Sequence, residues 1–392
     1  MRELVRFLER REEARRPRTR ASAIAALVTY VLLSLGGFTM LIPLAWMVST
    51  SLKLPGAVFT IPPEWIPRRQ VRQFVLGEER PIFEVYINGR LRRVALLEHK
   101  RDLSRVVPVD EVFRRKRGDG AGEGKLEINE FVVKRKELKP VKEIHLEWSN
   151  YYKAWTAVEI DHYLINFQLG KRHIRWLHIT HGFVMFYINS VLVAVVVTFG
   201  QVFTSSLAGY AFARLNFPAR DKIFLGYLAT MMIPYTVIMI PNFILMRSLR
   251  LIDTYWALML PPLFSAYGTF MLRQFFMGIP QELEDAARID GCSKFGVYLN
   301  VILPLSKPAL ATLATFTFIG SWNSFMWPLI VTNRPEMKTL PIGIAHFQGL
   351  YNTEWTLLMA ASVIVIAPVI LVFVFNQRFF QQGIHLAGLG GR

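Results

Sequence analysis

One short acidic segment combines residue types that can recognise a basic partner. Pro280 suits the first turn of a helix, and Glu282, Glu284 and Asp285 follow where carboxylates complement the positive end of the helix dipole. The two alanines that come next are strong helix formers with little bulk, and Gly291 ends the helix or permits a sharp turn. Such a helix can enter a cleft of a partner and pair its carboxylates with arginine or lysine there. On this pattern alone, an ordinary solvated loop helix is an equal alternative.

A second set of residues could line a path through an apolar protein. Pro234 and Pro241 interrupt one apolar segment, and broken helices often surround a translocation path. A kink that neighbouring helices shield would have the same sequence pattern and is an equal alternative. Asn323 is polar within another apolar run, so it faces either a wet path or a helix to which it hydrogen bonds. Trp322 and Trp327 could stack on a sugar or could mark the membrane interface. These five residues are the candidates for a translocation path.

Other chemistries find no support in the residue pattern. The glycine run before Lys125 fails as a phosphate-binding loop, because Asp119 replaces the first glycine and Leu126 replaces the hydroxyl residue. The single cysteine, Cys292, excludes an internal disulfide, and the spacing of four histidines fits no compact metal site. These histidines are His162, His173, His178 and His181. We therefore expect no catalytic residues, metal or cofactor in this chain, and surface positions near the membrane for the histidines.

The elements that must position these residues are apolar helices. Hydrophobic residues make up 52% of the 392 positions, which is unusual for a soluble chain of this length. A membrane-spanning helix needs roughly 20 mostly apolar residues, and six segments qualify. They are Ala23–Met47, Phe183–Leu207, Ile223–Leu245, Trp256–Phe276, Ala309–Val331 and Leu357–Phe375. We predict an all-α multi-pass membrane protein, with a first helix at 23–49 and a five-helix core at 183–376.

The placement of basic residues orients these helices. The formal net charge is +17, and the first 22 residues form an arginine-rich tail that should stay in the cytoplasm. Six spans return residues 377–392 to the same side, together with the basic loops that follow the second and fourth spans. Arg247 and Arg250 count against this orientation because they fall outside. We attribute the positive charge to orientation and to anionic lipid rather than to nucleic acid, because no basic-aromatic binding module is visible.

Residues 50–182 form one connection that is too long for a bare loop. Within it, Asn88-Gly89 lies between apolar β-branched runs, which is a strong signal for a hairpin. A second strand pair is expected from segments 126–133 and 144–148. We predict a small β-rich insertion at about 68–147 on the extracytoplasmic side, since long loops translocate regardless of charge.

The acidic segment resembles the E-A-A-x3-G-x9-I-x-L-P signature of ABC importer permeases. The matching positions are Asp285, Ala286, Ala287, Gly291, Val301, Leu303 and Pro304. Asp285 and Val301 replace the glutamate and isoleucine of the signature, and Glu284 could take over from the shorter aspartate. The resemblance implies that a loop at about 278–308 docks in a groove of a separate ATPase and transmits its closure to the membrane helices.

Further segments are similar to the carbohydrate branch of that family, specifically its smaller maltose-type permease. They are Asn189-Ser190, Tyr210–Arg214, Ile233-Pro234, Ile240-Pro241, Ser321–Asn323, Trp327–Leu329, Gln377–Ile384 and, beside the insertion, Ser49–Lys53 and Trp148–Trp155. The resemblance implies a permease subunit of a sugar or oligosaccharide importer, which is not itself an enzyme. Its implied partners are an ABC ATPase dimer that binds ATP and magnesium, a second and distinct permease, an extracytoplasmic solute-binding protein and membrane lipid.

Two other classes compete with this interpretation. A secondary transporter or channel would favour internal repeats or charged residues within the spans, and neither is visible. A membrane-bound enzyme built on the insertion would need a nucleophile with its base or a metal cluster, and no such group stands out there. The importer permease is therefore the favoured prediction.

Overall fold

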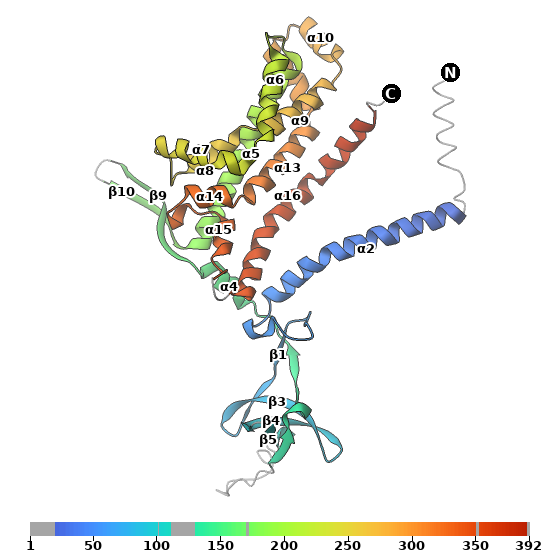
Figure 1. Cartoon of the computed structure of the whole chain (residues 1–392), viewed down its shortest axis with the longest axis vertical. Helices are drawn as coiled ribbons and strands as arrows, with labels where there is room; N and C mark the ends of the chain where they lie inside the picture. Colours follow the sequence, from blue (N-terminus) through green and yellow to red (C-terminus); the bar gives the residue numbers. More distant parts are fainter. Residues whose placement is uncertain (1–19, 101, 111–129, 170–171, 350–352, 390–392) are drawn as a thin grey trace.

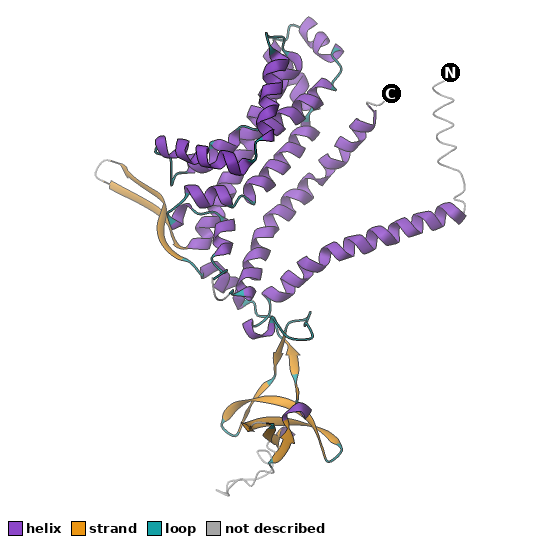
Figure 2. Ribbon diagram, in the orientation of Figure 1, coloured by secondary structure: helices purple, strands orange, loops and turns teal. Residues whose placement is uncertain are grey.

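The computed structural model describes residues 20–100, 102–110, 130–169, 172–349 and 353–389. Figures 1 and 2 show a helical part, a small β-sheet joined to one end of it, and a first helix that projects from the body. Helix α10 (Glu282–Ile289) lies at the opposite end of the molecule from the sheet. These ends are called the α10 end and the sheet end below.

The helical part begins with α2 (Arg20–Ser51), and the long α5 (Gly182–Arg214) and α16 (Trp355–Leu389) run through it. Shorter helices complete it: α4 (Ser149–Thr156), α6 (Arg220–Ala229), α7 (Tyr235–Ser248), α8 (Tyr255–Met259), α9 (Ala266–Met277), α11 (Lys294–Val297), α12 (Leu303–Leu305), α13 (Lys307–Trp322), α14 (Met326–Val331) and α15 (Leu340–Ala345).

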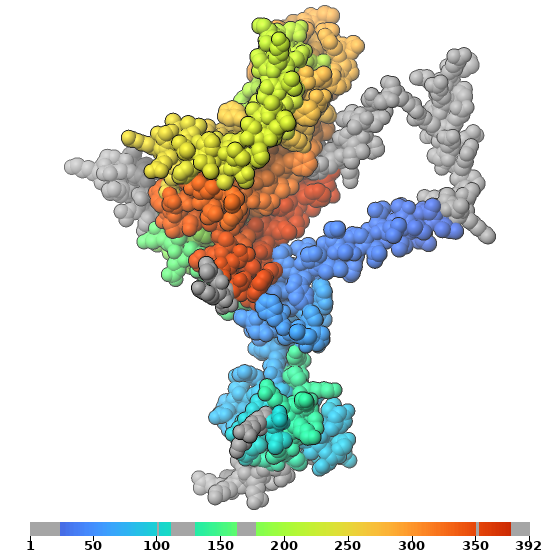
Figure 3. Space-filling model, in the orientation of Figure 1, coloured from blue at the N-terminus to red at the C-terminus, as the bar shows by residue number. Residues whose placement is uncertain are grey.

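Among the described residues, three helices are long and apolar enough to cross a membrane by themselves. They lie at Ile24–Ser51, Gly182–Arg214 and Trp355–Gln377, which matches the predicted first, second and sixth spans. In the first of them no part of the apolar window is buried, and Figure 3 shows α2 projecting from the body. A helix this apolar requires lipid or a partner subunit around it.

The prediction of six spanning helices is not confirmed, because the other three segments are broken in the described residues. The third bends by 100° between α6 and α7, where Ile233 is extended and Pro234 caps the next helix. The fourth breaks between α8 and α9 at Pro261 and Pro262. The fifth ends at Trp322, and α13 is bent by 77° from the segment before it. Proline removes a backbone donor and disfavours helical conformation in the residue before it. The sequence could therefore indicate a kink at the two proline breaks, but not that the chain turns there.

Helix α5 is the centre of the helical part, and it packs against α9 and α13. Two glycines allow the close approach to α9. A Cβ at Gly209 would lie 3.1 Å from the backbone nitrogen of Arg273, and a Cβ at Gly268 would lie 2.6 Å from the Ser205 hydroxyl oxygen. Small residues at helix crossings are typical where no hydrophobic effect drives helices together.

The segment before α4 contains a sheet with the order β2-β3-β4-β5-β6, in which β7 also pairs with β3. Asn88-Gly89 joins β3 to β4, with φ of 52° and 77°, so the hairpin predicted there is present. The strands are β1 (Arg68–Gln70), β2 (Arg72–Val75), β3 (Glu78–Ile87), β4 (Arg90–Lys100), β5 (Leu103–Pro108), β6 (Phe131–Lys134), β7 (Lys139–Pro140) and β8 (Lys142–Ile144).

The second strand pair was predicted wrongly. Strand β6 pairs with β5, and β8 pairs with β1 to form a neck that leads to the sheet, while Leu126 and Ile128 lie outside the described residues. A further hairpin, β9 (Glu159–Leu169) with β10 (Arg172–His181), was missed. It contains the four histidines singled out above, and residues 170–171 between its strands lie outside the described residues. Alternation of polar and apolar residues in that hairpin was the available signal.

The two chain segments that flank the sheet meet at a buried joint. The Asn150 side-chain amide donates to the Ser51 and Lys53 carbonyls, at 2.9 and 2.8 Å. The Lys53 ammonium lies 3.9 Å from the centre of the Trp46 ring, and burial lowers the pKa of Lys53, although the Glu64 carboxylate acts in the opposite direction. This joint closes the helical part without any residue of the sheet.

We therefore expect the sheet to be removable. Arg68 lies opposite Ile144 in the neck, so two glycines can replace residues 69–143 without strain. The shortened permease should insert into membranes and melt in detergent at the temperature of the full chain. Thermal unfolding followed by tryptophan fluorescence measures this.

The matched control is Asn150→Ala, which removes two buried hydrogen bonds and should destabilise by about 1–3 kcal/mol. A shortened chain that fails to insert would show that the sheet, and not the joint, holds the two flanks together.

Candidate functional site

Helix α10 ends in a cap that requires glycine. The Gly291 nitrogen donates to the Arg288 carbonyl and the Cys292 nitrogen donates to the Ala287 carbonyl, at 3.0 and 2.9 Å. Gly291 has φ of +88°, and nothing lies within 4 Å of where its Cβ would be. This pair of bonds is the Schellman motif, in which a left-handed residue closes the helix. The predicted role of Gly291 as a helix end is therefore present in the structure.

Glu284 faces into the protein. Its carboxylate Oε1 lies 2.7 Å from Arg214 Nε at the end of α5, and the two side chains are only 2% and 11% exposed. Arg288 is a more distant second partner, at 3.7 Å. A carboxylate held in this way cannot reach another subunit, so Glu284 does not take over the role predicted for Asp285.

Asp285 faces outward on the next position of the helix. Its side chain is 54% exposed, and its only close cation among the described residues is Arg288, at 3.7 Å. Exposed large apolar side chains occur in the same segment, namely Ile289, which is 87% exposed, and also Leu283 and Phe295. An exposed carboxylate among exposed apolar side chains is suited to a protein partner rather than to water alone.

The remaining signature residues lie close by. Ala286 is exposed and Ala287 is half-buried, so they add little bulk to the outer face of α10. Leu303 and Pro304 begin α12, after a π-helical turn at Tyr298–Ile302. Leu303 packs against the buried cluster that holds the α10 end together, which includes Tyr210, Phe276 and Tyr298. The signature thus forms one exposed helix and its packed foundation.

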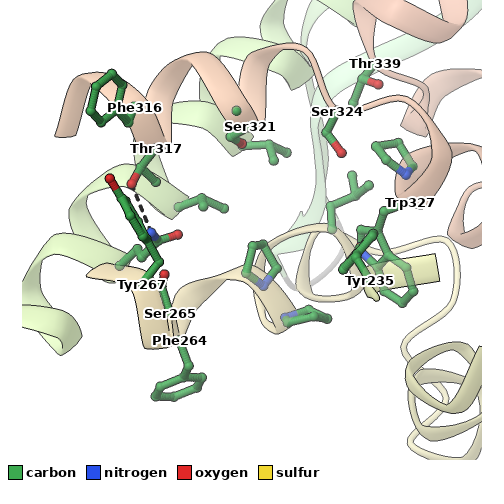
Figure 4. Close-up of a pocket in the computed structure, with 18 of the residues that line it drawn as sticks. Tyr235, Phe264, Ser265, Tyr267, Phe316, Thr317, Ser321, Ser324, Trp327 and Thr339 are labelled. Carbon is green, nitrogen blue, oxygen red and sulfur yellow. Dashed lines mark hydrogen bonds between the residues drawn. The ribbon is translucent and has the colours of Figure 1, made fainter. Parts of the chain in front are cut away.

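A cavity of about 510 Å³ lies between α5, α7, α9, α13 and α14. Its wall includes Tyr235, just after the bend between α6 and α7, and Pro261 and Pro262, which separate α8 from α9. Its polar lining residues are Ser190, Gln201, Tyr235, Asn242, Ser265, Tyr267, Thr317, Ser321, Ser324 and Thr339. In the view of Figure 4, Tyr267 and Thr317 lie at one end and Tyr235 and Trp327 at the other.

The chemistry of this lining suits a hydroxylated solute. Hydroxyl and amide groups offer hydrogen bonds, and the Gln201 amide already donates to the Thr317 hydroxyl at 3.0 Å. Aromatic rings of Tyr235, Tyr267 and Phe316 supply flat apolar faces beside them. None of the described lining residues carries a formal charge. A few polar groups on an aromatic and apolar wall are typical of a ligand site.

The structure separates the five residues predicted for a path. Trp327 lines the cavity, but its indole nitrogen donates to the Ala257 carbonyl at 2.9 Å. Trp322 is buried in the core and donates to the Val365 carbonyl, so its ring is not free to stack on a solute. Asn323 is exposed at the end of α13, and Pro234 and Pro241 shape α7 without lining the cavity.

Sequence reasoning missed most of the lining residues. Gln201, Asn242 and Thr317 are polar positions within apolar helices, which was the one signal available. Asn189 and Ser190 had been noted only for their resemblance to a family pattern. The Asn189 amide donates to the Glu336 and Lys338 carbonyls, and the Ser190 hydroxyl accepts from the Leu340 nitrogen. These two residues fasten the segment before α15 to α5.

Comparison with known proteins shows which family this chain resembles. Residues 182–386 match the family model described as "Binding-protein-dependent transport system inner membrane component". The chain is 35% identical over 254 residues to the arabinooligosaccharides transport system permease protein AraQ of Bacillus subtilis, which covers 65% of this chain and 87% of that protein.

Two further proteins are similar to this chain. The chain is 37% identical over 215 residues to the sn-glycerol-3-phosphate transport system permease protein UgpE of Pectobacterium atrosepticum, which covers 53% of this chain and 76% of that protein. The crystal structure of a bacterial ABC transporter involved in the import of alginate superposes with a TM-score of 0.57 at 19% identity, covering 92% of this chain and 98% of that one. The last likeness concerns the fold alone.

The cap of α10 generates a prediction. Gly291→Ala places a side chain on a left-handed backbone and should destabilise the purified permease by roughly 1–2 kcal/mol. Gly291→Asn should cost less, since asparagine tolerates this conformation. Thermal unfolding in detergent measures both.

The control is Gly226→Ala in α6, a helical site with open space around its Cβ. Alanine there should be neutral or stabilise slightly, by about 0.5–1 kcal/mol. Equal effects of the two alanine substitutions would contradict the assigned cap.

Proposed function

The chain belongs to the family of binding-protein-dependent transport system inner membrane components, and from this premise we propose that its cavity forms part of the path of the imported solute. The chain is a permease subunit of an ABC sugar importer and a multi-pass protein of the cell membrane. It is not itself the ATPase, which is a separate subunit in these systems. The observation that carries the proposal is that the family match spans both the cavity and α10.

The solute of this importer is a sugar or oligosaccharide. The relatives named above are transport proteins for arabino-oligosaccharides or sn-glycerol-3-phosphate, and all of these compounds carry free hydroxyl groups. Ser265, Thr317 and Ser321 supply complementary hydroxyls, and Tyr267 supplies an aromatic face. Stacking on a ring together with hydrogen bonds to hydroxyls is a combination that a polyhydroxylated solute can satisfy. Asn323 and Trp322 stay outside this path in our proposal.

Helix α10 is the contact with the ATPase dimer. Asp285 presents a carboxylate to a basic residue of the ATPase, while Ile289 and Leu283 supply apolar contact around it. Gly291 holds the end of the helix in its left-handed cap. Closure of the ATPase then moves α10 together with the packed segment around Leu303 and Pro304 that follows it in the chain.

The orientation follows from these assignments. The α10 end and both termini lie in the cytoplasm, and the sheet lies outside with the solute-binding protein. A second, distinct permease completes the path and covers apolar surface that this chain leaves exposed, including that of α2. The sheet contacts an external partner or shields the mouth of the path.

A charge reversal on α10 tests the ATPase contact. Asp285→Lys should weaken ATPase binding by about one to two decades in affinity, because a charge-assisted hydrogen bond is worth roughly 1.5–3 kcal/mol. Asp285→Glu should bind as well as the original, since it keeps the carboxylate. Titration of the purified ATPase onto the reconstituted permease pair measures the affinity.

The matched control is Asp290→Lys, a charge reversal at an exposed position beside the same helix end. Unchanged ATPase binding by Asp285→Lys would exclude α10 as the docking contact. An equal loss in both variants would show that only the overall charge of this surface matters.

Cysteine labelling tests the orientation. In a Cys292→Ala background, Ile289→Cys should react with a membrane-impermeant maleimide only from the cytoplasmic side, and Asn88→Cys only from the outside. Both positions are suited to labelling, because Ile289 is largely exposed and Asn88 lies in a hairpin turn. Labelling of both from one side would overturn the proposed topology.

A further inference from the structure

One face of α5 is bonded to the segment that contains α10. Ser206, Tyr210 and Arg214 follow one another at four-residue spacing, so they share a face of this helix. Each contacts a different position of residues 284–298, and all three side chains are buried or nearly so. We call these three residues the α5 ladder.

The strongest contact of the α5 ladder is made by Arg214. Its guanidinium pairs with the Glu284 carboxylate at 2.7 Å and donates to the Phe276 carbonyl at 2.6 Å and to the Ile279 carbonyl. The two carbonyls belong to the end of α9 and the turn after it, where a helix dipole favours a cation. One side chain thus joins α5, α9 and α10 in a site where water is largely excluded.

The other two contacts lie deeper in the protein. The Tyr210 hydroxyl donates to the Lys294 carbonyl at 2.9 Å, at the start of α11. The Ser206 and Tyr298 hydroxyls share a hydrogen bond, with 2.6 Å between their oxygens. Together the three contacts hold both the helix that faces the ATPase and the chain that returns from it.

The same helix lines the cavity with its other half, through Ser190, Val193, Val197 and Gln201. Gln201 and Arg214 are separated by 13 positions, or about 20 Å of continuous helix at 1.5 Å per residue. The α5 helix has no proline and no break over this distance, unlike the third, fourth and fifth apolar segments. Helix α5 therefore joins the cavity wall to the α10 segment within one unbroken helix, and α9, which lines the cavity at Tyr267, is bonded to the same ladder through the Phe276 carbonyl.

We propose that the α5 ladder is the connection through which movement of α10 reaches the cavity, with Ser206, Tyr210 and Arg214 as positioning residues. This inference rests on the proposed ATPase contact of α10. The covalent route through α12 and α13 carries a bend of 77°, whereas the ladder acts on a straight helix through directed bonds. In this proposal Glu284 joins α10 to Arg214 of the ladder and does not contact the ATPase.

The test uses a reporter that needs no identified solute. Ser321→Cys in a Cys292→Ala background places a thiol in the cavity wall. In the assembled complex with its ATPase and second permease, the rate of reaction with N-ethylmaleimide is measured with and without ATP and vanadate. The ratio of the two rates reports how far the nucleotide state changes the cavity.

The first variant combines Tyr210→Phe with Tyr298→Phe, which removes two hydroxyls and leaves the rings in place. ATPase binding should be unchanged, while the effect of ATP and vanadate on the labelling rate should become smaller by at least about fivefold. Fivefold is the lower end of the range for energetic coupling between two sites. A ladder that only stabilises the fold would lower the unfolding temperature and leave the ratio intact. An unchanged ratio in this variant overturns the inference.

The second variants address the ion pair. Glu284→Leu leaves Arg214 buried without its carboxylate and should reduce both stability and the rate ratio. The double variant Arg214→Met with Glu284→Leu should recover stability but not the ratio, because the directed bonds are gone. Recovery of the full ratio in the double variant would show that the pair serves stability alone.

Two controls separate this inference from the function it rests on. Asp221→Asn weakens the pairs of an exposed carboxylate with Arg220 and Arg273 near the same end and should change neither readout. Asp285→Lys should weaken ATPase binding, as stated above. If it does so while the ladder variants keep the full ratio, only the ladder is wrong, and if it does not, the proposed ATPase contact is wrong.

Discussion

A peptide group in hydrocarbon must find its hydrogen bond within the protein, and the helical part of this chain meets that constraint in two ways. Helices α2, α5 and α16 satisfy it by continuity, since each runs as a single helix over more than a membrane thickness. The other apolar segments are broken at Pro234, at Pro261 with Pro262, and after Trp322. These breaks gather beside the cavity, where packed neighbours and side-chain caps such as Ser265 on the Gly268 nitrogen satisfy the freed groups.

Glu284 and Asp285 are adjacent carboxylates that the structure places in different environments. Both are carboxylates in the first turns of one helix, and the sequence treats them as alternatives. A helix turns by about 100° per residue, so neighbouring positions cannot face the same way. Glu284 meets Arg214 inside the protein, and Asp285 is left on the surface. One carboxylate therefore anchors the helix and the other is free to meet a partner.

The joint at Asn150 explains how a sheet can interrupt a membrane protein between its first two spans. The side-chain amide bonds to carbonyls on the far side of the insertion, at Ser51 and Lys53. Both flanks belong to the segments that resemble the family pattern, while the sheet hangs from a two-stranded neck, β1 with β8. The contacts that join the two flanks therefore involve no residue of the sheet. The sheet has small hydrophobic clusters of its own.

The sequence by itself determined the class of the molecule, its long apolar helices, the hairpin at Asn88-Gly89 and the helix that ends at Gly291. Each of these depends on local rules: apolar length, turn conformation and the left-handed cap. The tertiary structure decided that Glu284 turns inward, that Trp322 belongs to the core and that Gln201, Ser265 and Thr317 share one cavity. These outcomes depend on which elements pack together, and residues more than 100 positions apart, such as Gln201 and Thr317, leave no trace of their contact in local spacing. The sequence showed where helices could be interrupted, and only the packing around those interruptions turned them into a cavity.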